Sequence, residues 1–516
     1  KFVGGIIMNR PPHQKVIEGV HWFADDENIL EELPSILSHP NRKELKKNKY
    51  RSIFEISTSK RKVIKIYDDP RFSQKVKERL STSHAGKEWA AAKQLKKMGV
   101  GTVQGIAYGE KREGNWIKSS ALLMEEVEDA KSLTEILTDR SLSPTKMNHL
   151  IQKLSEIVHR MHQAGICHRD LHGNNILVSG DELHILDLST IWYLSWFPER
   201  AKEKNLEKLI QTFQIAGRST GAFRFCKSYL NRCQSKESYR AVYRRIKKGS
   251  QHRIQKQYIS QTNRALQGGS QFKIWRKSPY RIARAGIEAE ELFNRKDSFR
   301  NNSPIEIPLN QKLISGWTKE YSHPSRARAK SRRGWIGLRA LEVRGIPSPK
   351  GLAWMEAPHG ESSWIIMEKI ECDHPLGKWF REEGYRMPAF DRHRLTRNLA
   401  QFVKTIHTNG IYHNDYSPKN FLVGKIEGEW IIHIVDPESV QLSRSLTQRR
   451  KIRNLSQIAD LGKLVSRTDR LRFLKSYLGN LPRAKWEPIA RRVWEETLRR
   501  ISARISRTGQ SEPTEP

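Results

Sequence analysis

Residues 168–178 read His-Arg-Asp-Leu-His-Gly-Asn-Asn-Ile-Leu-Val, a polar cluster that runs directly into an apolar strand. A second apolar stretch, Ile185-Leu186-Asp187-Leu188, follows after a short turn. This spacing places Asp170 and Asn175 at the two ends of one short loop and Asp187 at the end of the next strand. The pattern is that of the catalytic loop of protein kinases, with Asp-Leu-Ser where many of them have Asp-Phe-Gly. The alternative is a polar turn with an ordinary surface aspartate, but it does not explain why the motif and its flanking strands agree.

The polar side chains of this cluster match the needs of phosphoryl transfer. One carboxylate must orient the acceptor hydroxyl, and an amide and a second carboxylate must hold the Mg²⁺ ions that bridge the nucleotide phosphates. Asp170 fits the first role, and Asn175 and Asp187 fit the second. We therefore predict a phosphotransferase site with Asp170 as a catalytic residue and Asn175 and Asp187 as metal ligands.

The segment ahead of the loop predicts two strands and a helix. Ser52–Ser57 and Val63–Tyr67 are typical of paired strands, and a helix is expected from about His84 to Met98. Kinase chemistry needs a strand lysine on the α- and β-phosphates, held by a helix glutamate. Lys65 and Glu88 are the candidates for this catalytic pair. A strand lysine alone is usually a solvated edge residue, so the order of these residues ahead of the loop supports the interpretation.

A predicted hinge and a predicted helix connect this pair to the loop. Ala121–Glu125 indicates a strand that leads into the hinge, where backbone groups of Met124 and Glu125 would meet adenine. A helix with apolar residues at i, i+3 and i+4 spacing then starts at Ser143-Pro144. Residues 50–65 contain no glycine, so we expect no glycine-rich loop over the phosphates and a different turn that grips the nucleotide.

The chain carries the same signature twice. His413–Val423 (His-Asn-Asp-Tyr-Ser-Pro-Lys-Asn-Phe-Leu-Val) repeats the first loop, and a second strand that ends in Asp436 follows it. The repeat distance far exceeds the ~20–50 residues of a solenoid repeat, so it indicates duplicated domains. We predict an α+β chain of two tandem protein-kinase-like domains, each with a small β-rich N-lobe and a helical C-lobe. The first is residues 1–248, with an N-terminal extension at 1–45, and the second is residues 249–516.

The two copies differ in the glutamate that should hold the lysine. Gly334 stands where the first copy has Glu88, and the candidate lysine of the second copy is Lys319. The second strand also ends in Asp436-Pro437-Glu438, a departure that counts against a working second site. We therefore place catalysis in the first domain and interpret the second as a weaker kinase or a nucleotide-binding regulatory copy. The expected nucleotide contacts of the second copy are Lys319, Asp415, Asn420 and Asp436.

The chain of 516 residues is strongly basic. Lys and Arg total 93 against 56 Asp and Glu, a formal net charge of +37. An excess of this size indicates a polyanionic partner, and the charge alone leaves nucleic acid, an anionic membrane surface and a phosphorylated glycolipid open. One basic run extends from Arg240 to Lys256 on an expected interdomain helix, and another from Arg326 to Arg333. A solvated helix face is the alternative for either run.

Several classes of protein are disfavoured by composition. No apolar run approaches the ~18 residues of a membrane span, and the first residues lack the length and the cleavage site of a signal peptide. The four cysteines form no CxxC pair and no Cys/His cluster, so we expect neither a disulfide framework nor a zinc site. A reducing cytoplasm is the expected compartment.

An aromatic stretch follows the Asp-Leu-Ser segment. Residues 191–197 read Ile-Trp-Tyr-Leu-Ser-Trp-Phe and are apolar in six of seven positions. A kinase places its acceptor-binding segment there. The stretch predicts either an interfacial patch among lipid headgroups near a glycolipid acceptor or packing on the C-lobe core, the usual fate of aromatic side chains.

Taken together, three features resemble the bacterial lipopolysaccharide core kinases: the paired loops, the missing glycine-rich loop and a short C-lobe block, Asn205-Leu206 followed by Arg224–Leu230. The resemblance covers about residues 50–230 well and about residues 260–500 less completely. It implies a protein-kinase-like fold that transfers phosphate from ATP, with Mg²⁺, to heptose or Kdo sugars at the cytoplasmic membrane face. The roles that it implies are catalytic base for Asp170, Mg²⁺ ligands for Asn175 and Asp187, and phosphate anchor for Lys65 with Glu88.

Three functions follow as hypotheses. The first, which we favour, is an ATP-dependent sugar kinase that acts on an anionic glycolipid of the lipopolysaccharide inner core. It would be cytoplasmic and peripheral on the inner face of the cytoplasmic membrane. The second is an atypical Ser/Thr protein kinase associated with RNA or ribosomes, which the charge of +37 also suits. The third is a tandem pseudokinase scaffold, which the altered second copy suggests.

Overall fold

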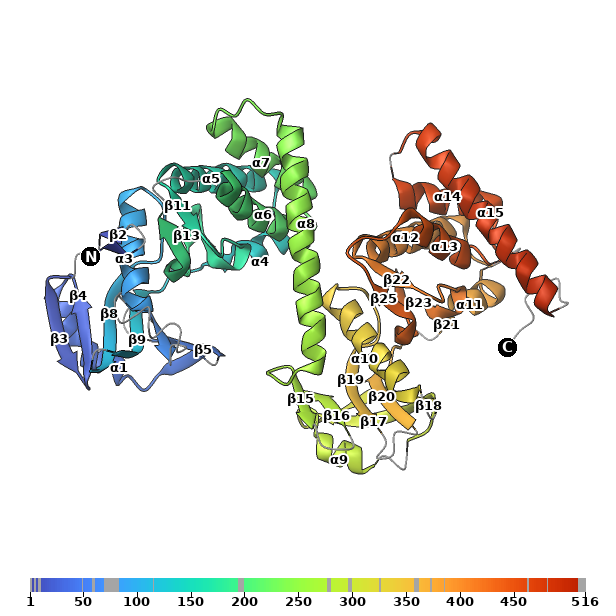
Figure 1. Ribbon diagram of the computed structural model, residues 1–516, viewed down its shortest axis with the longest axis horizontal. Helices are drawn as coiled ribbons and strands as arrows, with labels where there is room; N and C mark the ends of the chain where they lie inside the picture. The colour runs from blue at the N-terminus through green and yellow to red at the C-terminus, as the bar shows by residue number, and fades with distance from the viewer. Residues whose placement is uncertain are drawn as a thin grey trace. The chain divides into compact units, whose positions relative to one another are not determined.

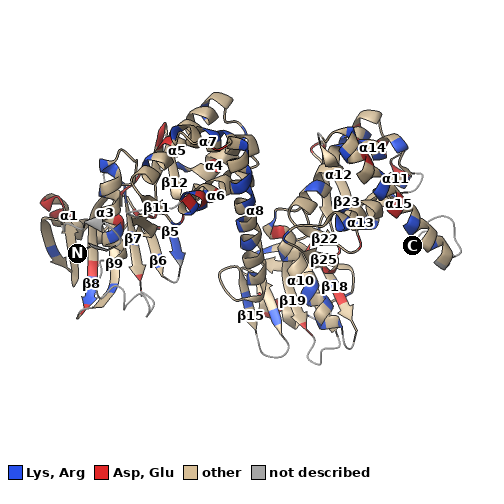
Figure 2. Cartoon of the chain, turned by 45° about the horizontal axis from the view of Figure 1, so that its top comes forward, with Lys and Arg blue, Asp and Glu red and all other residues tan. Residues whose placement is uncertain are grey.

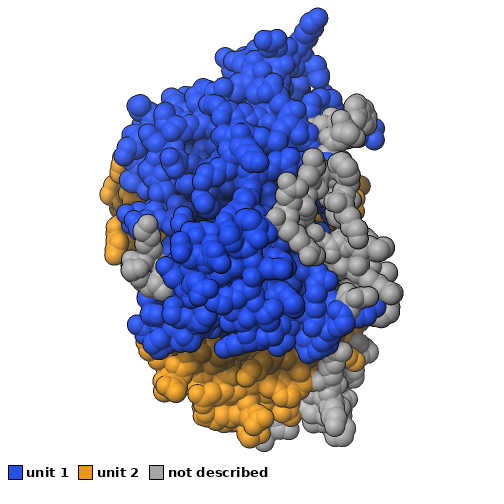
Figure 3. Space-filling model, turned by 90° about the vertical axis from the view of Figure 1, so that its left-hand side faces the viewer, with its two compact units in different colours: residues 1–253 blue, residues 254–516 orange. Residues whose placement is uncertain are grey.

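A computed structural model divides the chain into two compact units, residues 1–253 and residues 254–516 (Figure 1; Figure 3). Each unit contains an antiparallel sheet followed by a helical part, which confirms the predicted α+β class. The boundary between the units and the predicted boundary at residues 248 and 249 both lie within helix α8 (Tyr239–Asn263). The structure describes residues 2–3, 6–7, 11–48, 50–57, 61–68, 83–114, 116–193, 199–275, 280–295, 299–323, 326–356, 362–371, 374–384, 386–461, 464–479 and 481–508.

The main sheet of unit 1 contains, among the described residues, seven strands: β3 (His13–Ile17), β4 (Val20–Ala24), β5 (Arg42–Asn48), β6 (Arg51–Ile56), β7 (Lys62–Asp68), β8 (Gly105–Glu113) and β9 (Trp116–Glu125). Their order is β3-β4-β8-β9-β7-β6-β5, and every pairing is antiparallel. Lys65 of β7 lies opposite Ile53 of β6 and Leu122 of β9. The two predicted strands that frame the lysine are therefore confirmed, and the lysine is inside the sheet. A separate pair, β1 (Phe2–Val3) and β2 (Ile6–Ile7), precedes it.

β3, β4 and β5, which precede β6 in the chain, belong to this sheet. β3 and β4 form a hairpin, β4 pairs with β8, and β5 pairs with β6 at the opposite edge. Helix α1 (Glu27–Leu37) connects them and buries Leu30 and Leu33 in the core beside the sheet. Described residues of the predicted N-terminal extension, 1–45, thus add strands and a helix to this sheet. This was not visible in the sequence, because β4 pairs with a strand far along the chain and such a pairing leaves no local signal.

Helix α3 (His84–Lys97) confirms the helix predicted in this region. Ser83 caps it, because its hydroxyl accepts from an N–H of the first turn. Trp89 of the helix packs with Tyr108 and Leu122 on the sheet. This packing turns the neighbouring Glu88 toward β7, and Glu88 is only 4% exposed.

The helical part of unit 1 contains α4 (Leu133–Thr138), α5 (Pro144–Gln163), α6 (Glu199–Ile215), α7 (Ser219–Arg232) and the first part of α8 (Figure 1). Ser143 caps α5, and Pro144 occupies its first turn, as the sequence predicts. Leu154 and Val158 of α5 are fully buried in the core that α5 shares with α7. Burial of each such side chain stabilises the fold by about 1.5–3 kcal/mol.

Short strands hold the predicted catalytic loop at both ends. The loop follows β11 (Ile166–His168), contains the 3₁₀ turn Gly173–Asn175 and runs into β12 (Ile176–Ser179). β12 pairs with β13, which leads to Asp187, and β11 pairs with the strand after Asp187. The loop and Asp187 are thus brought side by side. The remaining strands of this part are β10 (Lys131–Ser132), β13 (Glu182–Ile185) and β14 (Ile191–Tyr193).

The main sheet of unit 2 contains, in the part of the chain that the structure describes, six strands: β15 (Phe272–Trp275), β16 (Arg281–Arg284), β17 (Ser303–Leu309), β18 (Lys312–Ser322), β19 (Gly351–Glu356) and β20 (Ser362–Glu368). Their order is β15-β16-β19-β20-β18-β17. Lys319 of β18 lies opposite Ile365 of β20. Helix α9 (Ala289–Asn294) lies between β16 and β17 in the chain, and α10 (Ala327–Val343) packs on the sheet.

The helical part of unit 2 contains α11 (Leu376–Glu382), α12 (Ala389–Thr408), α13 (Gln448–Ile458), α14 (Arg467–Leu478) and α15 (Arg483–Thr508) (Figure 1). Its short strands are β21 (His374–Pro375), β22 (Ile411–His413), β23 (Phe421–Ile426), β24 (Glu429–Ile434) and β25 (Val440–Leu442). They pair as β21-β23-β24 and β22-β25. None of the described helices is both long and apolar enough to cross a lipid bilayer.

Candidate functional site

Lys65 and Glu88 form a buried ion pair in unit 1. The Lys65 Nζ lies 3.0 Å from Oε1 and 3.0 Å from Oε2 of Glu88. Lys65 is 3% exposed. Burial alone would lower the pKa of Lys65, but the Glu88 and Asp187 carboxylates raise it above its ordinary value, so the ammonium stays charged. The structure thus brings together the two residues that the sequence paired.

Asp187 reaches the same lysine from the end of the strand region. Its carboxylate contacts Lys65 Nζ and lies 2.9 Å from an Arg51 guanidinium nitrogen. The backbone of Asp187 has a φ of 56°, a left-handed conformation that turns the chain sharply. This turn lets the N–H of Leu188 donate to Glu88 Oε1 at 3.2 Å. Burial would raise the pKa of Asp187, but Lys65 and Arg51 lower it.

Two members of this cluster were not foreseen from the sequence. The Tyr67 hydroxyl donates to Glu88 Oε2, and Arg51 pairs with Asp187. Tyr67 is two residues after Lys65 on one strand, so the alternation of side chains already places both on one face. Arg51 reaches the cluster from β6, a neighbouring strand whose register the sequence alone does not fix.

Asp170 lies in the loop with a lysine and a histidine as neighbours. Its Oδ1 is 2.9 Å from Lys208 Nζ, and its Oδ2 is 3.4 Å from His172 Nε2. The hydrogen bond from His172 and the nearby Lys208 lower the pKa of Asp170, although partial burial opposes this. The side chain is half exposed, so the carboxylate is ionised and accessible. Lys208 comes from α6, far from the loop in sequence, and no motif signalled it.

Asn175 and His168 tie the loop to itself. The Asn175 Nδ2 donates to the carbonyl oxygen of Asp170 at 2.9 Å, which leaves the amide oxygen as the group that can meet a cation. The His168 Nε2 donates to the carbonyl oxygen of Leu186 at 2.8 Å, and the N–H of Asp170 donates to His168 Nδ1 at 3.1 Å. A neutral imidazole therefore connects Asp170 with the residue before Asp187.

These donors fit a magnesium ion that is shared with a ligand. Among the described residues, no group of three or more His, Cys, Asp or Glu side chains could hold a metal by itself. Mg²⁺ characteristically takes one or two protein oxygen ligands and completes its shell with phosphates and water. Asn175 and Asp187 could supply those protein oxygens, and nucleotide phosphates and water would supply the rest.

The predicted hinge residues lie at the end of β9. Met124 is paired within the sheet, opposite Val63 of β7 and Gly105 of β8. The N–H of Glu125 donates to the carbonyl oxygen of Gln104 at 3.2 Å. An adenine contact by Glu125 would therefore use its carbonyl group.

Unit 2 repeats the loop geometry. The Asn420 Nδ2 donates to the carbonyl oxygen of Asp415 at 2.8 Å, as Asn175 does to Asp170. Asp436 has a φ of 63°, close to the 56° of Asp187. The Asp436 Oδ1 lies 2.8 Å from Lys319 Nζ. The four residues predicted for the second nucleotide site therefore have the same mutual contacts as their counterparts.

The lysine of unit 2 does have a glutamate, which corrects the sequence interpretation. Lys319 Nζ lies 2.7 Å from Oε1 of Glu438, two residues after Asp436. The sequence predicts that Gly334 removes this partner and that Asp436-Pro437-Glu438 counts against a working site. The partner instead comes from the turn after the strand. An alignment compares residues at equivalent positions, so it does not detect a carboxylate that arrives from another element.

The basic run on α8 is partly neutralised within unit 1. Arg245 pairs with Glu203 and Glu237, and Arg253 pairs with Glu207, each closest contact being 2.6–3.0 Å. Exposed cations remain along the helix (Figure 2). They are Arg240, Arg244, Lys248 and Lys256.

The described part of the aromatic stretch after Asp187 contains both buried and exposed side chains, as the two alternative predictions would have it. Ile191 is buried and Tyr193 is half-buried against the core, whereas the Trp192 side chain is 53% exposed. The Arg169 guanidinium lies over the Trp192 ring, 4.4 Å from its centroid. Residues 194–197 of the stretch lie outside the described residues. An exposed aromatic ring with a cation thus flanks the loop that carries Asp170.

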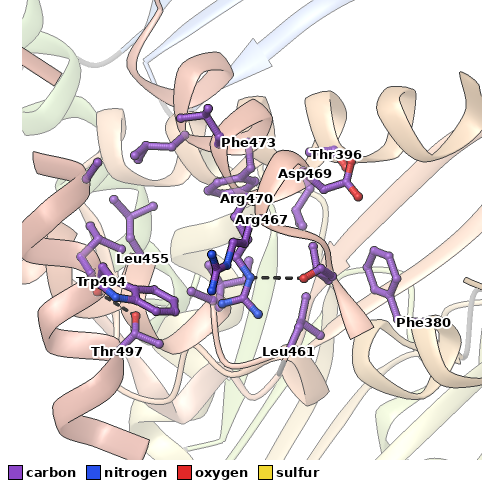
Figure 4. A pocket seen from close by; sticks show the side chains of 18 of the residues that line it. Phe380, Thr396, Leu455, Leu461, Arg467, Asp469, Arg470, Phe473, Trp494 and Thr497 are labelled. Atoms are coloured by element: carbon purple, nitrogen blue, oxygen red, sulfur yellow. Dashed lines mark hydrogen bonds between the residues drawn. The ribbon is translucent and has the colours of Figure 1, made fainter. Parts of the chain in front are cut away.

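An apolar cavity of about 510 Å³ lies elsewhere, in the helical part of unit 2 (Figure 4). Leu455 of α13, Phe473 of α14 and Trp494 of α15 are among the residues that line it. It includes none of the residues that surround Lys319 or Asp415. We therefore assign it no part in the candidate site.

Several known proteins with similar sequences are named as kinases of lipopolysaccharide sugars. The chain is 29% identical over 163 residues to "Lipopolysaccharide core heptose(I) kinase WaaP" of Escherichia coli, which covers 29% of this chain and 62% of that protein. It is 31% identical over 139 residues to "3-deoxy-D-manno-octulosonic acid kinase" of Vibrio vulnificus (strain CMCP6), which covers 26% of this chain and 54% of that protein. The matched segments thus span less than two thirds of either relative.

A solved structure and a family model also match. The structure "WaaP in complex with acyl carrier protein" is 21% identical, covers 43% of this chain and 92% of that chain, and has a TM-score of 0.34. The family model "Lipopolysaccharide kinase (Kdo/WaaP) family" matches residues 43–231 and, a second time, residues 312–477. The two matches together cover more than half of the chain, and they confirm the resemblance seen in the motifs. The chain belongs to the lipopolysaccharide kinase (Kdo/WaaP) family.

Proposed function

We propose that unit 1 transfers the γ-phosphate of ATP to a sugar hydroxyl of an anionic glycolipid, the inner core of lipopolysaccharide. The observation that carries this proposal is the buried cluster in which Lys65 Nζ meets the carboxylates of both Glu88 and Asp187. Family membership and the names of the similar kinases support the sugar acceptor. The two units would be tandem kinase-like domains, residues 1–248 and 249–516, with catalysis in the first.

The cluster suits a nucleotide with its metal. Lys65, held by Glu88, would bind the α- and β-phosphates, and Met124 and Glu125 would border the adenine. Asn175 and Asp187 would hold Mg²⁺, which neutralises charge that develops on the phosphates. Asp187 would then exchange its contacts with Lys65 and Arg51 for the metal.

Asp170 would orient the acceptor hydroxyl. Its pKa lies below the ordinary value because of His172 and Lys208, so the carboxylate is ionised at neutral pH and can accept a hydrogen bond from the hydroxyl. A carboxylate of low pKa is a weak base, but phosphoryl transfer depends mainly on position and electrostatics. Lys208 is close enough to Asp170, at 2.9 Å, to add positive charge near the transferred group.

The surroundings of Asp170 suit an anionic glycolipid. Arg169 and the exposed Trp192 lie side by side next to the loop. A guanidinium can bind phosphate or carboxylate groups of a core sugar, and an exposed tryptophan ring suits a sugar face or a headgroup region. The net charge of +37 would add a general attraction to an anionic membrane surface, where the protein would be peripheral on the cytoplasmic side.

The test is transfer of labelled γ-phosphate from Mg·ATP into a dephosphorylated lipopolysaccharide core fraction. We expect Asp170→Asn to reduce the rate by about 10²–10⁴-fold, the usual contribution of such a group, and Asp415→Asn to retain transfer. The variants are close to isosteric, so the pair compares the two loops directly. Label that enters protein instead would support the protein-kinase hypothesis, and nucleotide binding without any transfer would support the scaffold hypothesis. Either result would overturn the proposal.

A further inference from the structure

Lys319 of unit 2 is held by two carboxylates from one turn. The Asp436 Oδ1 is 2.8 Å and the Glu438 Oε1 is 2.7 Å from Lys319 Nζ. In unit 1, the aspartate partner of Lys65 comes from the same place, but the glutamate partner comes from helix α3. The ion cluster therefore has the same residue types in both units. The glutamate belongs to a helix in unit 1 and to the 3₁₀ turn Pro437–Ser439 in unit 2.

A tyrosine completes the correspondence. The Tyr321 hydroxyl donates to Glu438 Oε2 at 3.0 Å, and in unit 1 the Tyr67 hydroxyl donates to Glu88 Oε2. Each tyrosine is two residues after its lysine on the same strand. Glu438 thus has both contacts that characterise Glu88, one with the lysine and one with the tyrosine.

The helix position has no room for a side chain in unit 2 unless its neighbours move. A Cβ atom on Gly334 would lie 2.7 Å from Ile365 Cδ1 and 2.9 Å from the Tyr321 hydroxyl oxygen. Both distances are shorter than ordinary van der Waals contact. The glycine therefore accommodates the tyrosine, and the carboxylate enters from the turn.

The charged side chains of this cluster are also largely buried, so each of them needs an oppositely charged partner. The Glu438 side chain is 8% exposed and that of Lys319 is 23% exposed. A charge removed from water costs free energy unless an opposite charge and hydrogen bonds compensate it. The arrangement holds a charged ammonium beside Asp436 and the Asp415–Asn420 loop, where the phosphates of a nucleotide would lie.

We propose that unit 2 contains a second site for a magnesium-bound nucleoside triphosphate, in which Glu438 takes the lysine-positioning role that Glu88 has in unit 1. Lys319 would bind the phosphates, and Asn420 and Asp436 would hold Mg²⁺. This inference rests on the proposed function, because the nucleotide site of unit 1 is its template. It adds a positioning residue that lies outside the helix where kinases carry it.

The test is equilibrium dialysis of the full chain with labelled ATP and Mg²⁺. The wild type is expected to bind two nucleotides, Asp187→Asn one, and Asp436→Asn one. In the Asp187→Asn background, Glu438→Gln is expected to weaken the remaining site roughly 10- to 100-fold, the effect of losing one charge-assisted contact. Ser189→Ala, at the position in unit 1 that corresponds to Glu438, is the matched control and should leave both sites unchanged.

The outcomes separate this inference from the proposed function. If the wild type binds one nucleotide and Asp187→Asn abolishes this binding, the inference is overturned, and the proposed nucleotide site of unit 1 stands. One site that only Asp436→Asn abolishes would support the second site and refute the nucleotide site of unit 1. Full affinity in Glu438→Gln would overturn the role of Glu438, and no binding in the wild type would overturn both proposals.

Hydrogen exchange gives a second measurement that needs no change at Glu438. In the Asp187→Asn protein, Mg·ATP should slow exchange in peptides that contain Lys319 and Asp436. Unchanged exchange at saturating nucleotide would contradict the second site. The same peptides without nucleotide show whether Glu438→Gln remains folded.

Discussion

The two units build the same ion cluster from different elements. In both, a lysine inside a sheet contacts an aspartate in a left-handed turn and a glutamate that also accepts from a tyrosine. In unit 1 the glutamate belongs to α3, and in unit 2 it belongs to the turn after β24. What matters for the lysine is therefore the position of the glutamate carboxylate. The helix or turn that carries the glutamate can differ.

The loops differ in a similar way. Lys208 of α6 contacts Asp170 in unit 1, whereas in unit 2 Lys419, within the loop itself, lies 3.2 Å from Asp415. Gln457 of α13 donates to the carbonyl oxygen of Asn414 at 2.7 Å, the backbone position that Lys208 contacts in unit 1. Both units thus have a side chain that donates to this backbone carbonyl oxygen. The positive charge beside the aspartate comes from α6 in unit 1 and from the exposed Lys419 in unit 2.

The largest expected difference between the units concerns the buried lysines. Lys65→Met would leave Glu88 in a site where its side chain is 5% exposed, so we expect unit 1 to lose about 3–5 kcal/mol in free energy of unfolding, as when one member of a buried pair is removed. Lys319→Met removes a lysine whose side chain is 23% exposed, compared with 4% for Lys65, so solvent screens its ion pairs more strongly. We expect a smaller loss in unit 2, about 1–3 kcal/mol.

Hydrogen exchange in increasing urea measures both losses, because peptides from β7 and β18 report on each unit separately. Lys62→Met is the control for a lysine outside the buried cluster, because Lys62 is on the same strand as Lys65 and lies 3.6 Å from the carboxylate of Glu32, whose side chain is 61% exposed. Equal losses for Lys65→Met and Lys319→Met would show that solvent reaches both clusters alike, and would break the distinction between them.

The sequence predicted those parts of the site whose residues are close together along the chain or follow a known order. The spacing of Asp170, Asn175 and Asp187 is local, and short strands hold the loop that they share. Lys208 and Glu438 were missed as partners because their contacts depend on tertiary packing of distant elements. The pairing of β4 with β8 was missed for the same reason, and it is what joins the β3–β4 hairpin to the sheet.

Buried histidines provide a property in which the two units should agree. His162 contacts Tyr229 and Asn205 in unit 1, and His407 makes the equivalent contacts with Tyr477 and Asn454 in unit 2. An asparagine Oδ1 only accepts, so each Nε2 must donate and each Nδ1 accepts from the tyrosine, as in a neutral imidazole. Burial lowers the pKa of His162 to about 3 and that of His407 to about 4.

Acid should therefore destabilise both units to the same extent between pH 7 and pH 5. The unfolded histidine, with a pKa near 6.5, binds a proton in this range and the folded one does not, so the free energy of unfolding falls as the pH falls. We expect about 2 kcal/mol at pH 5 for each histidine. His162→Gln and His407→Gln should remove this part of the pH dependence from their own unit, as judged by hydrogen exchange at the two pH values. An acid sensitivity confined to one unit would contradict the equivalence of these pairs.

The smallest expected effect concerns the short helices α4 and α11, which precede α5 and α12 in the chain. α4 begins with a capping box, in which the Ser132 hydroxyl accepts from the N–H of Glu135 at 3.2 Å and the Glu135 carboxylate accepts from the N–H of Ser132 at 2.7 Å. The equivalent helix α11 is preceded at its N-cap by Pro375, whose side chain offers no acceptor. Ser132→Ala should destabilise α4 locally by about 1 kcal/mol, which corresponds to roughly fivefold faster exchange of its amides, whereas Pro375→Ala should leave α11 within about 0.5 kcal/mol of the wild type. Because α4 packs on the 3₁₀ turn of the predicted catalytic loop, faster exchange should extend to Gly173–Asn175 in Ser132→Ala. If only α4 responds, the cap stabilises its own helix without supporting the loop, and the two units are alike in how their loops are held.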